Sequence, residues 1–128
     1  MATILVVEDD ADLQTALLEG LKDEGYEVRA APNGLEALAE LLSDDERPSL
    51  ILLDLMMPLM NGWQFLDERI HYPGLSSIPV LVLTASTHAR PAQAAAVLRK
   101  PIQPIELFET VRKTLASGDG SVMCAGTA

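Results

Sequence analysis

Leu50-Ile51-Leu52-Leu53-Asp54 is a short, branched apolar run that ends in an acid. Four apolar residues in sequence, too few for an ordinary helix, are typical of a strand buried on both faces. A carboxylate is costly to bury unless charges or hydrogen bonds compensate for the lost water. We therefore expect a buried central strand and a specific chemical role for Asp54.

Three further apolar runs, near residues 3, 80 and 96, have the same form. Each leads to a group that can bind phosphate or metal: Glu8 and Asp9 after the first run, Thr84 after the second and Lys100 after the third. The sequence thus places groups that can bind phosphate or metal at the ends of several predicted strands.

Between these runs lie segments in which Leu and Ala recur at helical spacing, and the connections are short. This alternation predicts an α/β fold, a doubly wound parallel sheet with helices on both faces. Residues 26–30 alternate apolar and charged, as in an edge strand. The main helices are expected over residues 11–24, 35–42, 63–70 and 105–115. We expect one domain over residues 1–116 and a flexible C-terminal tail over residues 117–128.

Composition narrows the functional classes. A formal charge of -10 argues against direct binding to nucleic acid, whose phosphates require Lys and Arg. The single cysteine, Cys124, excludes an internal disulfide and a cysteine metal cage. No apolar stretch approaches the ~20 residues of a membrane span and no basic leader precedes the first strand, so we expect a cytoplasmic protein. Neither GxGxxG nor GxxxxGK[ST] occurs.

The carboxyl ends of parallel strands meet at one edge of a sheet, where ligands bind. Glu8, Asp9 and Asp54 should meet there and repel one another, by about 4 kcal/mol for a pair 4 Å apart at an effective dielectric of 20. Mg²⁺ suits such an oxygen-rich site, and Lys100 can neutralise remaining charge. A phosphoryl group held there could be attacked by Asp54 to give an acyl phosphate, with Thr84 donating a hydrogen bond.

Five separated motifs carry a family resemblance, in this order: Glu8-Asp9, Asp54, Pro58 with Gly62, Thr84-Ala85 and Lys100-Pro101. In this order they resemble the receiver domain of two-component response regulators, over about residues 3–116. The resemblance implies a flavodoxin-like (βα)5 fold with strand order 2-1-3-4-5.

The resemblance also implies roles. Asp54 would be the phosphoacceptor, and Mg²⁺ would be held by Glu8, Asp9, Asp54 and the backbone carbonyl of Met56. Lys100 would pair with the phosphoryl group, and its bond to Pro101 would be cis.

The partners implied are a histidine kinase or a histidine phosphotransfer protein and an unknown downstream protein, with no nucleic acid and no membrane. We expect a stand-alone receiver, monomeric or weakly dimeric. It would not be an enzyme apart from catalysing its own phosphorylation and dephosphorylation.

Two features depart from the family. Only fifteen residues, 85–99, separate Thr84 from Lys100, and receivers usually have several more. Many receivers carry an aromatic residue three positions before the lysine, where this chain has Val97. In the family that aromatic turns inward as the threonine moves toward the phosphate. We predict a shortened, mobile fourth helix and a readout that uses another surface or the order of this segment.

Several alternatives stay open. The domain could be a phosphorelay intermediate, a phosphate sink or a degenerate docking module. An aspartyl-phosphate phosphohydrolase needs an acid two positions after the nucleophile, where Met56 stands. A flavin module would have to bind phosphate beside Glu8 and Asp9, which repel it.

Other polar and apolar residues near the motifs have structural explanations. Asp10 and Asp12 are expected at the start of the first helix, where negative charge is favourable. Trp63, Met56 and the neighbouring methionines are expected to serve packing.

Overall fold

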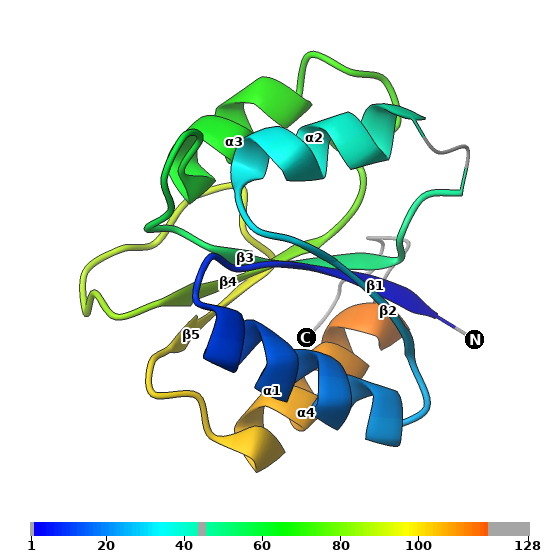
Figure 1. Ribbon diagram of the computed structural model, residues 1–128, viewed down its shortest axis with the longest axis vertical. Helices are drawn as coiled ribbons and strands as arrows, with labels where there is room; N and C mark the ends of the chain where they lie inside the picture. The colour runs from blue at the N-terminus through cyan, green and yellow to red at the C-terminus, as the bar shows by residue number, and fades with distance from the viewer. Residues whose placement is uncertain (1, 44–45, 118–128) are drawn as a thin grey trace.

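The computed structural model describes residues 2–43 and 46–117. All neighbouring strands of its five-stranded sheet are parallel, in the order β2-β1-β3-β4-β5 (Figure 1). The strands are β1 (Thr3–Val7), β2 (Glu27–Ala31), β3 (Leu50–Asp54), β4 (Val80–Thr84) and β5 (Ala96–Arg99). This confirms the predicted doubly wound α/β fold, its strand order and the central position of β3.

Two helices pack on each face of the sheet (Figure 1). The upper pair is α2 (Gly34–Ser43) and α3 (Gly62–Arg69), and the lower pair is α1 (Ala11–Asp23) and α4 (Pro104–Ala116). Strand residues alternate between two apolar clusters, which we call the α2–α3 core and the α1–α4 core. The first includes Leu5, Ile51, Val82 and Phe65, and the second includes Val6, Leu52, Leu83 and Leu107.

Burial on both faces explains why β3 is apolar without interruption. All five residues of Leu50–Asp54 are buried, as are all five of Val80–Thr84. By contrast, β2 lies at an edge of the sheet and becomes buried only at its last residue, Ala31. The sequence prediction of an edge strand is confirmed, and the four main helices lie within a residue or two of their predicted bounds.

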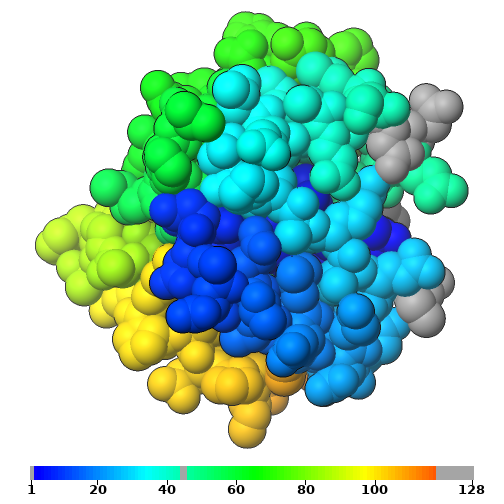
Figure 2. All heavy atoms as spheres, viewed as in Figure 1, coloured from blue at the N-terminus to red at the C-terminus, as the bar shows by residue number. Residues whose placement is uncertain are grey.

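The prediction of a short helix between Thr84 and Lys100 is wrong. None of residues 85–95 is helical, and the chain makes only a turn at Ala92 and Gln93 before β5. We call these residues the β4–β5 connection; it projects at the left of Figures 1 and 2. Hydroxyl oxygens of Thr84 and Ser86 bind backbone N–H groups at its start, and such bonds compete with the first turn of a helix. Few residues remain after Pro91 to form a helix.

The structure describes only the first residue of the predicted C-terminal tail. Ser117 caps the end of α4, and residues 118–128 of the predicted tail lie outside the described residues. Among the described helices, none is long and apolar enough to cross a membrane.

Candidate functional site at the carboxyl edge of the sheet

Glu8 and Asp54 end two adjacent strands on the same face of the sheet. Glu8 continues the alternation of Ile4 and Val6, and Asp54 continues that of Leu52, all of which point into the α1–α4 core. Glu8 is 1% exposed and Asp54 is 3% exposed, so both carboxylates have lost almost all contact with bulk water. Such burial requires compensating interactions.

Asp9 completes a cluster of three acids. One carboxylate oxygen from each of Glu8, Asp9 and Asp54 lies within 4.8 Å of the others, and Asp9 is exposed. This spacing allows a single cation to contact all three residues. The predicted convergence of these side chains is therefore confirmed by the fold.

Burial raises the pKa of Glu8 from 4.5 to about 7. The negative charge of Asp54 acts in the same direction, whereas the Asp10 N–H, which donates to Glu8 Oε2 at 3.1 Å, and the ammonium of Lys100 act against it. The site thus contains a carboxyl group that resists ionisation unless more positive charge is present.

Lys100 supplies part of that charge. Its Nζ lies 3.2 Å from Glu8 Oε1 and 3.4 Å from Asp54 Oδ1. Burial lowers the pKa of Lys100, but Asp54 and Glu8 raise it by more, so the net shift is upward and the ammonium stays charged. Its backbone N–H donates to Thr84 O at 2.8 Å, and the bond to Pro101 is cis, as the family resemblance implied.

The loop after β3 is tied closely to its surroundings. We call residues 55–61 the acceptor connection. The Met56 N–H donates to Asp54 Oδ1 at 3.2 Å, and the Gly62 N–H donates to Leu55 O at 2.9 Å. The Gly34 N–H at the start of α2 donates to Met60 O at 3.0 Å. Together these bonds tie the loop to Asp54, to α3 and to α2.

Two glycines make this close approach possible. A Cβ atom on Gly62 would lie 2.7 Å from Asp54 O and 2.7 Å from Leu55 Cα, and one on Gly34 would lie 2.7 Å from Met60 O. All three are backbone atoms that cannot simply move aside. The sequence motif identified Gly62. It gave no sign that the absence of a side chain at Gly62 lets the backbone there approach the backbone of Asp54 so closely.

Asn61 starts α3 with a capping box. Its side chain accepts from the Gln64 N–H, and the Gln64 side chain accepts from the Asn61 N–H. On the other side of the cluster, Asp10 caps α1 by accepting from the N–H groups of Asp12 and Leu13, which confirms the structural role predicted for Asp10. Both caps fix helices that begin at the edge of the site.

Thr84 ends β4 and is 2% exposed. Its Oγ1 accepts from the Ser86 N–H at 3.0 Å. Thr84 continues the alternation of Val80 and Val82, so its register is that of the α2–α3 core, whereas Asp54 follows that of the α1–α4 core. Ser86 stands two positions after Thr84, and a hydroxyl residue there is a recognisable turn signal.

Two residues expected to serve packing lie at the surface instead. Met56 is 73% exposed and Trp63 is 44% exposed, whereas Met57 is buried. Leu59, between them in sequence, is 75% exposed and has a φ of 68°, which is unusual for a residue with a bulky side chain. The acceptor connection therefore presents apolar side chains beside the acidic cluster.

The donor set fits Mg²⁺. Three carboxylates within reach of one another, one of them exposed, supply the hard oxygen ligands that this ion prefers, with room for water and a phosphoryl oxygen. The single ammonium of Lys100 does not balance three acids, so a divalent ion would lower the repulsion between them. The arrangement combines a buried acid, cation ligands and a fixed ammonium, which are the parts needed for transfer of a phosphoryl group to a carboxylate.

Comparison with known proteins identifies the family to which a chain with this site belongs. Residues 4–112 match the model of the response regulator receiver domain. The chain belongs to the family of response regulator receiver domains.

Similar proteins share most of the chain. It is 37% identical over 116 residues to the "Uncharacterized 14.6 kDa protein in sodA1 3'region" of Leptolyngbya boryana. That match covers 86% of this chain and 87% of the Leptolyngbya protein. It spans about half the length of other curated relatives that it matches.

Solved structures agree with the fold. The signal receiver domain of a signal transduction histidine kinase from Syntrophus aciditrophicus has a TM-score of 0.82 and 28% identity, with 98% of each chain covered. The response regulator protein TrrA from Thermotoga maritima, in complex with Mg²⁺ and BeF, has a TM-score of 0.78 and 33% identity. That match covers 88% of this chain and 98% of TrrA.

Proposed function

We propose that this receiver accepts a phosphoryl group on Asp54 in a Mg²⁺-dependent reaction and then signals through protein–protein interaction. One observation carries the proposal: the Asp54 carboxylate lies within a 4.8 Å cluster with Glu8 and Asp9 and 3.4 Å from the ammonium of Lys100. A buried acid with both a cation site and a fixed positive charge is suited to attack a phosphorus atom.

In the transfer step, a carboxylate oxygen of Asp54 forms a bond to phosphorus. The bond from phosphorus to the donor nitrogen of a phosphohistidine breaks, and its electron pair stays on the imidazole. Lys100 offsets negative charge on the phosphoryl oxygens, and the Thr84 hydroxyl donates a hydrogen bond to one of them. Mg²⁺, held by Glu8, Asp9, Asp54 and the carbonyl of Met56, would supply further charge neutralisation.

The donor would be a histidine kinase or a histidine phosphotransfer protein, since receiver domains take phosphate from histidine kinases. We further propose that the domain acts as a stand-alone cytoplasmic receiver, monomeric or weakly dimeric, with a protein as its downstream partner. Its formal charge of -10 argues against nucleic acid as that partner. Apart from making and losing its own acyl phosphate, it would not act as an enzyme.

A phosphohydrolase function lacks a proton donor. The residue two positions after Asp54 is the thioether Met56, which is 73% exposed and cannot act as a general acid. The absence of an acid at this position therefore favours a receiver function over that of a phosphohydrolase.

The test is incubation with Mg²⁺ and acetyl phosphate, followed by intact mass analysis. We expect one phosphoryl adduct on the native chain, none on Asp54→Asn and none when a chelator removes the metal. Asp67→Asn, which changes an exposed acid on α3, is the matched control and should form the adduct normally. An adduct that survives in Asp54→Asn, or is missing from the native chain, would overturn the assignment.

A further inference from the structure

Ser86 lies directly against Thr84. Its backbone N–H donates to Thr84 Oγ1 at 3.0 Å, and Thr84 is buried at the end of β4. The acceptor oxygen of this bond belongs to the hydroxyl that would turn toward a phosphoryl group on Asp54. Any shift of that hydroxyl must either stretch its bond to Ser86 or carry Ser86 with it.

The side chain of Ser86 extends this link into the connection that follows. Its Oγ accepts from the His88 N–H at 3.1 Å and from the Ala89 N–H at 3.2 Å. Two hydroxyl oxygens thus hold three backbone N–H groups within four residues. The position of the Thr84 hydroxyl and the backbone path of residues 86–89 are therefore joined by an unbroken series of hydrogen bonds.

The packing beneath this segment involves small side chains. Ala89 and Ala94 pack against the α2–α3 core beside the half-buried Val97, and all three side chains are small. No helical hydrogen-bond ladder crosses residues 85–95, and the far end is anchored by buried Pro91 and by the Ala95 N–H, which donates to Val80 O at 2.8 Å. Between Thr84 and Pro91 the connection is held by the hydroxyl bonds and by the packing of Ala89.

We propose that Ser86 is a positioning residue that couples the phosphorylation state of Asp54 to the conformation of residues 86–90. The coupling rests on the proposed function, because it begins with the response of Thr84 to a phosphoryl group. It takes the place of an aromatic side chain at position 97, where Val97 stands, and of a helix between β4 and β5, where none of residues 85–95 is helical.

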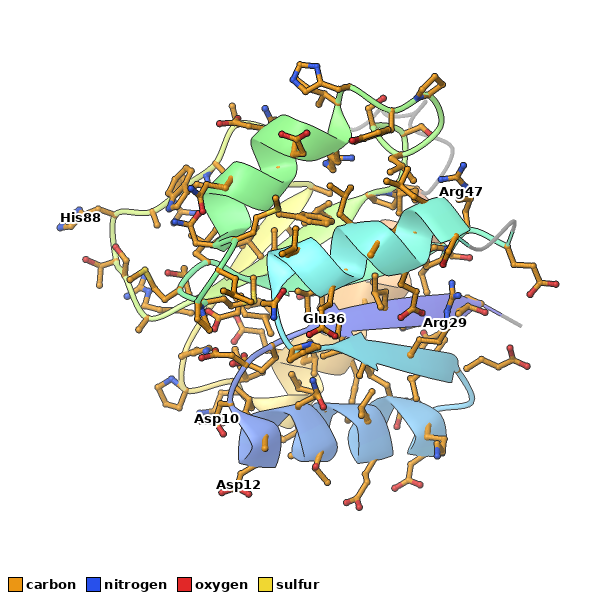
Figure 3. The ribbon with its side chains drawn as sticks, turned by 45° about the horizontal axis from the view of Figure 1, so that its top comes forward. Asp10, Asp12, Arg29, Glu36, Arg47 and His88 are labelled. Atoms are coloured by element: carbon orange, nitrogen blue, oxygen red, sulfur yellow. The ribbon has the colours of Figure 1, made fainter. Side chains whose placement is uncertain are left out.

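The coupled segment is accessible to a partner. His88 and Arg90 are exposed, and His88 lies at the outer tip of the connection (Figure 3). No Asp or Glu occurs from residue 69 to residue 105, although the chain carries nineteen of them. A change in residues 86–90 would therefore move an exposed segment that carries Arg90 and no acid.

Amide exchange followed by NMR tests the coupling in the full chain, with and without phosphorylation by acetyl phosphate and Mg²⁺. In the native chain, phosphorylation should change the exchange rates of the His88 and Ala89 amides by about fivefold or more, the size expected when a hydrogen bond is weakened. In Ser86→Ala, both amides should exchange rapidly before phosphorylation and show no further change. Ser86→Thr keeps the hydroxyl and should restore the native response.

Ser77→Ala is the matched control, because the Ser77 hydroxyl donates to Gly74 O in a turn that does not contact Thr84. It should behave as the native chain does. The coupling is overturned if Ser86→Ala keeps the phosphorylation-dependent change, if Ser86→Ala forms no adduct, or if a phosphorylated native chain shows no change. Intact mass analysis of each sample separates these results from failure of the proposed function, in which the native chain carries no adduct at all.

Discussion

The connections that leave β3 and β4 at the same edge of the sheet are built in opposite ways. The acceptor connection, residues 55–61, is fixed by backbone hydrogen bonds to α2 and α3, by a bond to the Asp54 side chain, and by contacts that leave no space for a side chain on Gly34 or Gly62. The β4–β5 connection, residues 85–95, contains no helix and begins with bonds from N–H groups to two hydroxyls.

The difference separates two tasks. Under the proposed function Asp54 has to be held in one geometry, and the fixed acceptor connection does this even at the cost of a positive φ at Leu59. A segment whose conformation is to change on phosphorylation needs an accessible second conformation. Small side chains and hydrogen bonds to hydroxyl groups allow one. The same sheet edge therefore carries a rigid half and an adjustable half.

The largest expected effect comes from disturbing the rigid half. Gly62→Ala places a Cβ atom 2.7 Å from the backbone of both Asp54 and Leu55, so that the acceptor connection must shift. We expect a loss of about 2 to 3 kcal/mol in the free energy of unfolding, measured by urea denaturation. Mg²⁺ binding should weaken in parallel because Asp54 moves.

Gly20→Ala is the control for that substitution. Its Cβ atom would lie 3.1 Å from Cζ of Phe108, a side chain that can move, and alanine is favoured over glycine inside a helix by about 1 kcal/mol. Gly20→Ala should therefore be neutral within about 1 kcal/mol. Equal losses in the two variants would contradict the idea that the acceptor connection is specially constrained.

The pH dependence of stability sharpens the description of the acidic cluster. The pKa of Glu8 is about 7 in the folded protein and 4.5 when unperturbed. Between these values the folded state keeps a proton that the unfolded chain loses, so its contribution to the free energy of unfolding falls as pH rises from about 4.5 to about 7. The fall should be on the order of 2 kcal/mol in the presence of a chelator.

The measurement is the difference between the native chain and Glu8→Gln in urea unfolding at pH 5 and pH 8. Glutamine keeps an oxygen that can accept from the Asp10 N–H but cannot ionise. The native chain should lose stability relative to Glu8→Gln over this range, and saturating Mg²⁺ should remove the loss. Parallel pH profiles without metal would show that burial of Glu8 does not resist its ionisation.

Lys100 connects the rigid half to the adjustable half, because its side chain contacts Glu8 and Asp54 while its backbone N–H donates to Thr84 O. Lys100→Ala should destabilise the metal-free protein by about 1 kcal/mol, since the ammonium is partly exposed. Asp54 should still be phosphorylated, but the exchange rates of the His88 and Ala89 amides should no longer respond. Lys113→Ala, an exposed lysine on α4, is the control. A native response in Lys100→Ala would remove this connecting role.

The strands and the acidic cluster at their shared edge were largely predictable from sequence, and the two connections were not. Apolar runs ending in Glu8, Asp54 and Lys100 indicate both the strands and their shared edge, because burial and alternation are local properties of the chain. The strand order came from family resemblance. The absence of a helix in residues 85–95 depends on whether hydroxyls bind the backbone before a helix forms, which is a competition between nearly equal states.

Contacts between backbone segments that are distant in sequence could not be predicted either. That Gly34 meets Met60 O and that Gly62 meets Asp54 O follows from how α2 and α3 pack on the sheet, and nothing in the sequence around either glycine reveals it. The exposure of Met56 and Trp63 has the same origin, because an apolar residue in a loop is buried only if a neighbouring element covers it.

The smallest effect tests the adjustable half most directly. Ala92→Gly should change the free energy of unfolding by less than about 0.5 kcal/mol, because Ala92 is exposed in a turn and not in a helix. Ala16→Gly, at an exposed position within α1, should cost about 1 kcal/mol, which is the difference in helix propensity. If Ala92→Gly cost as much as Ala16→Gly, a helix would form between β4 and β5 in solution. The readout would then have a rigid element after all, and Ser86 would act on a helix instead of on a loop.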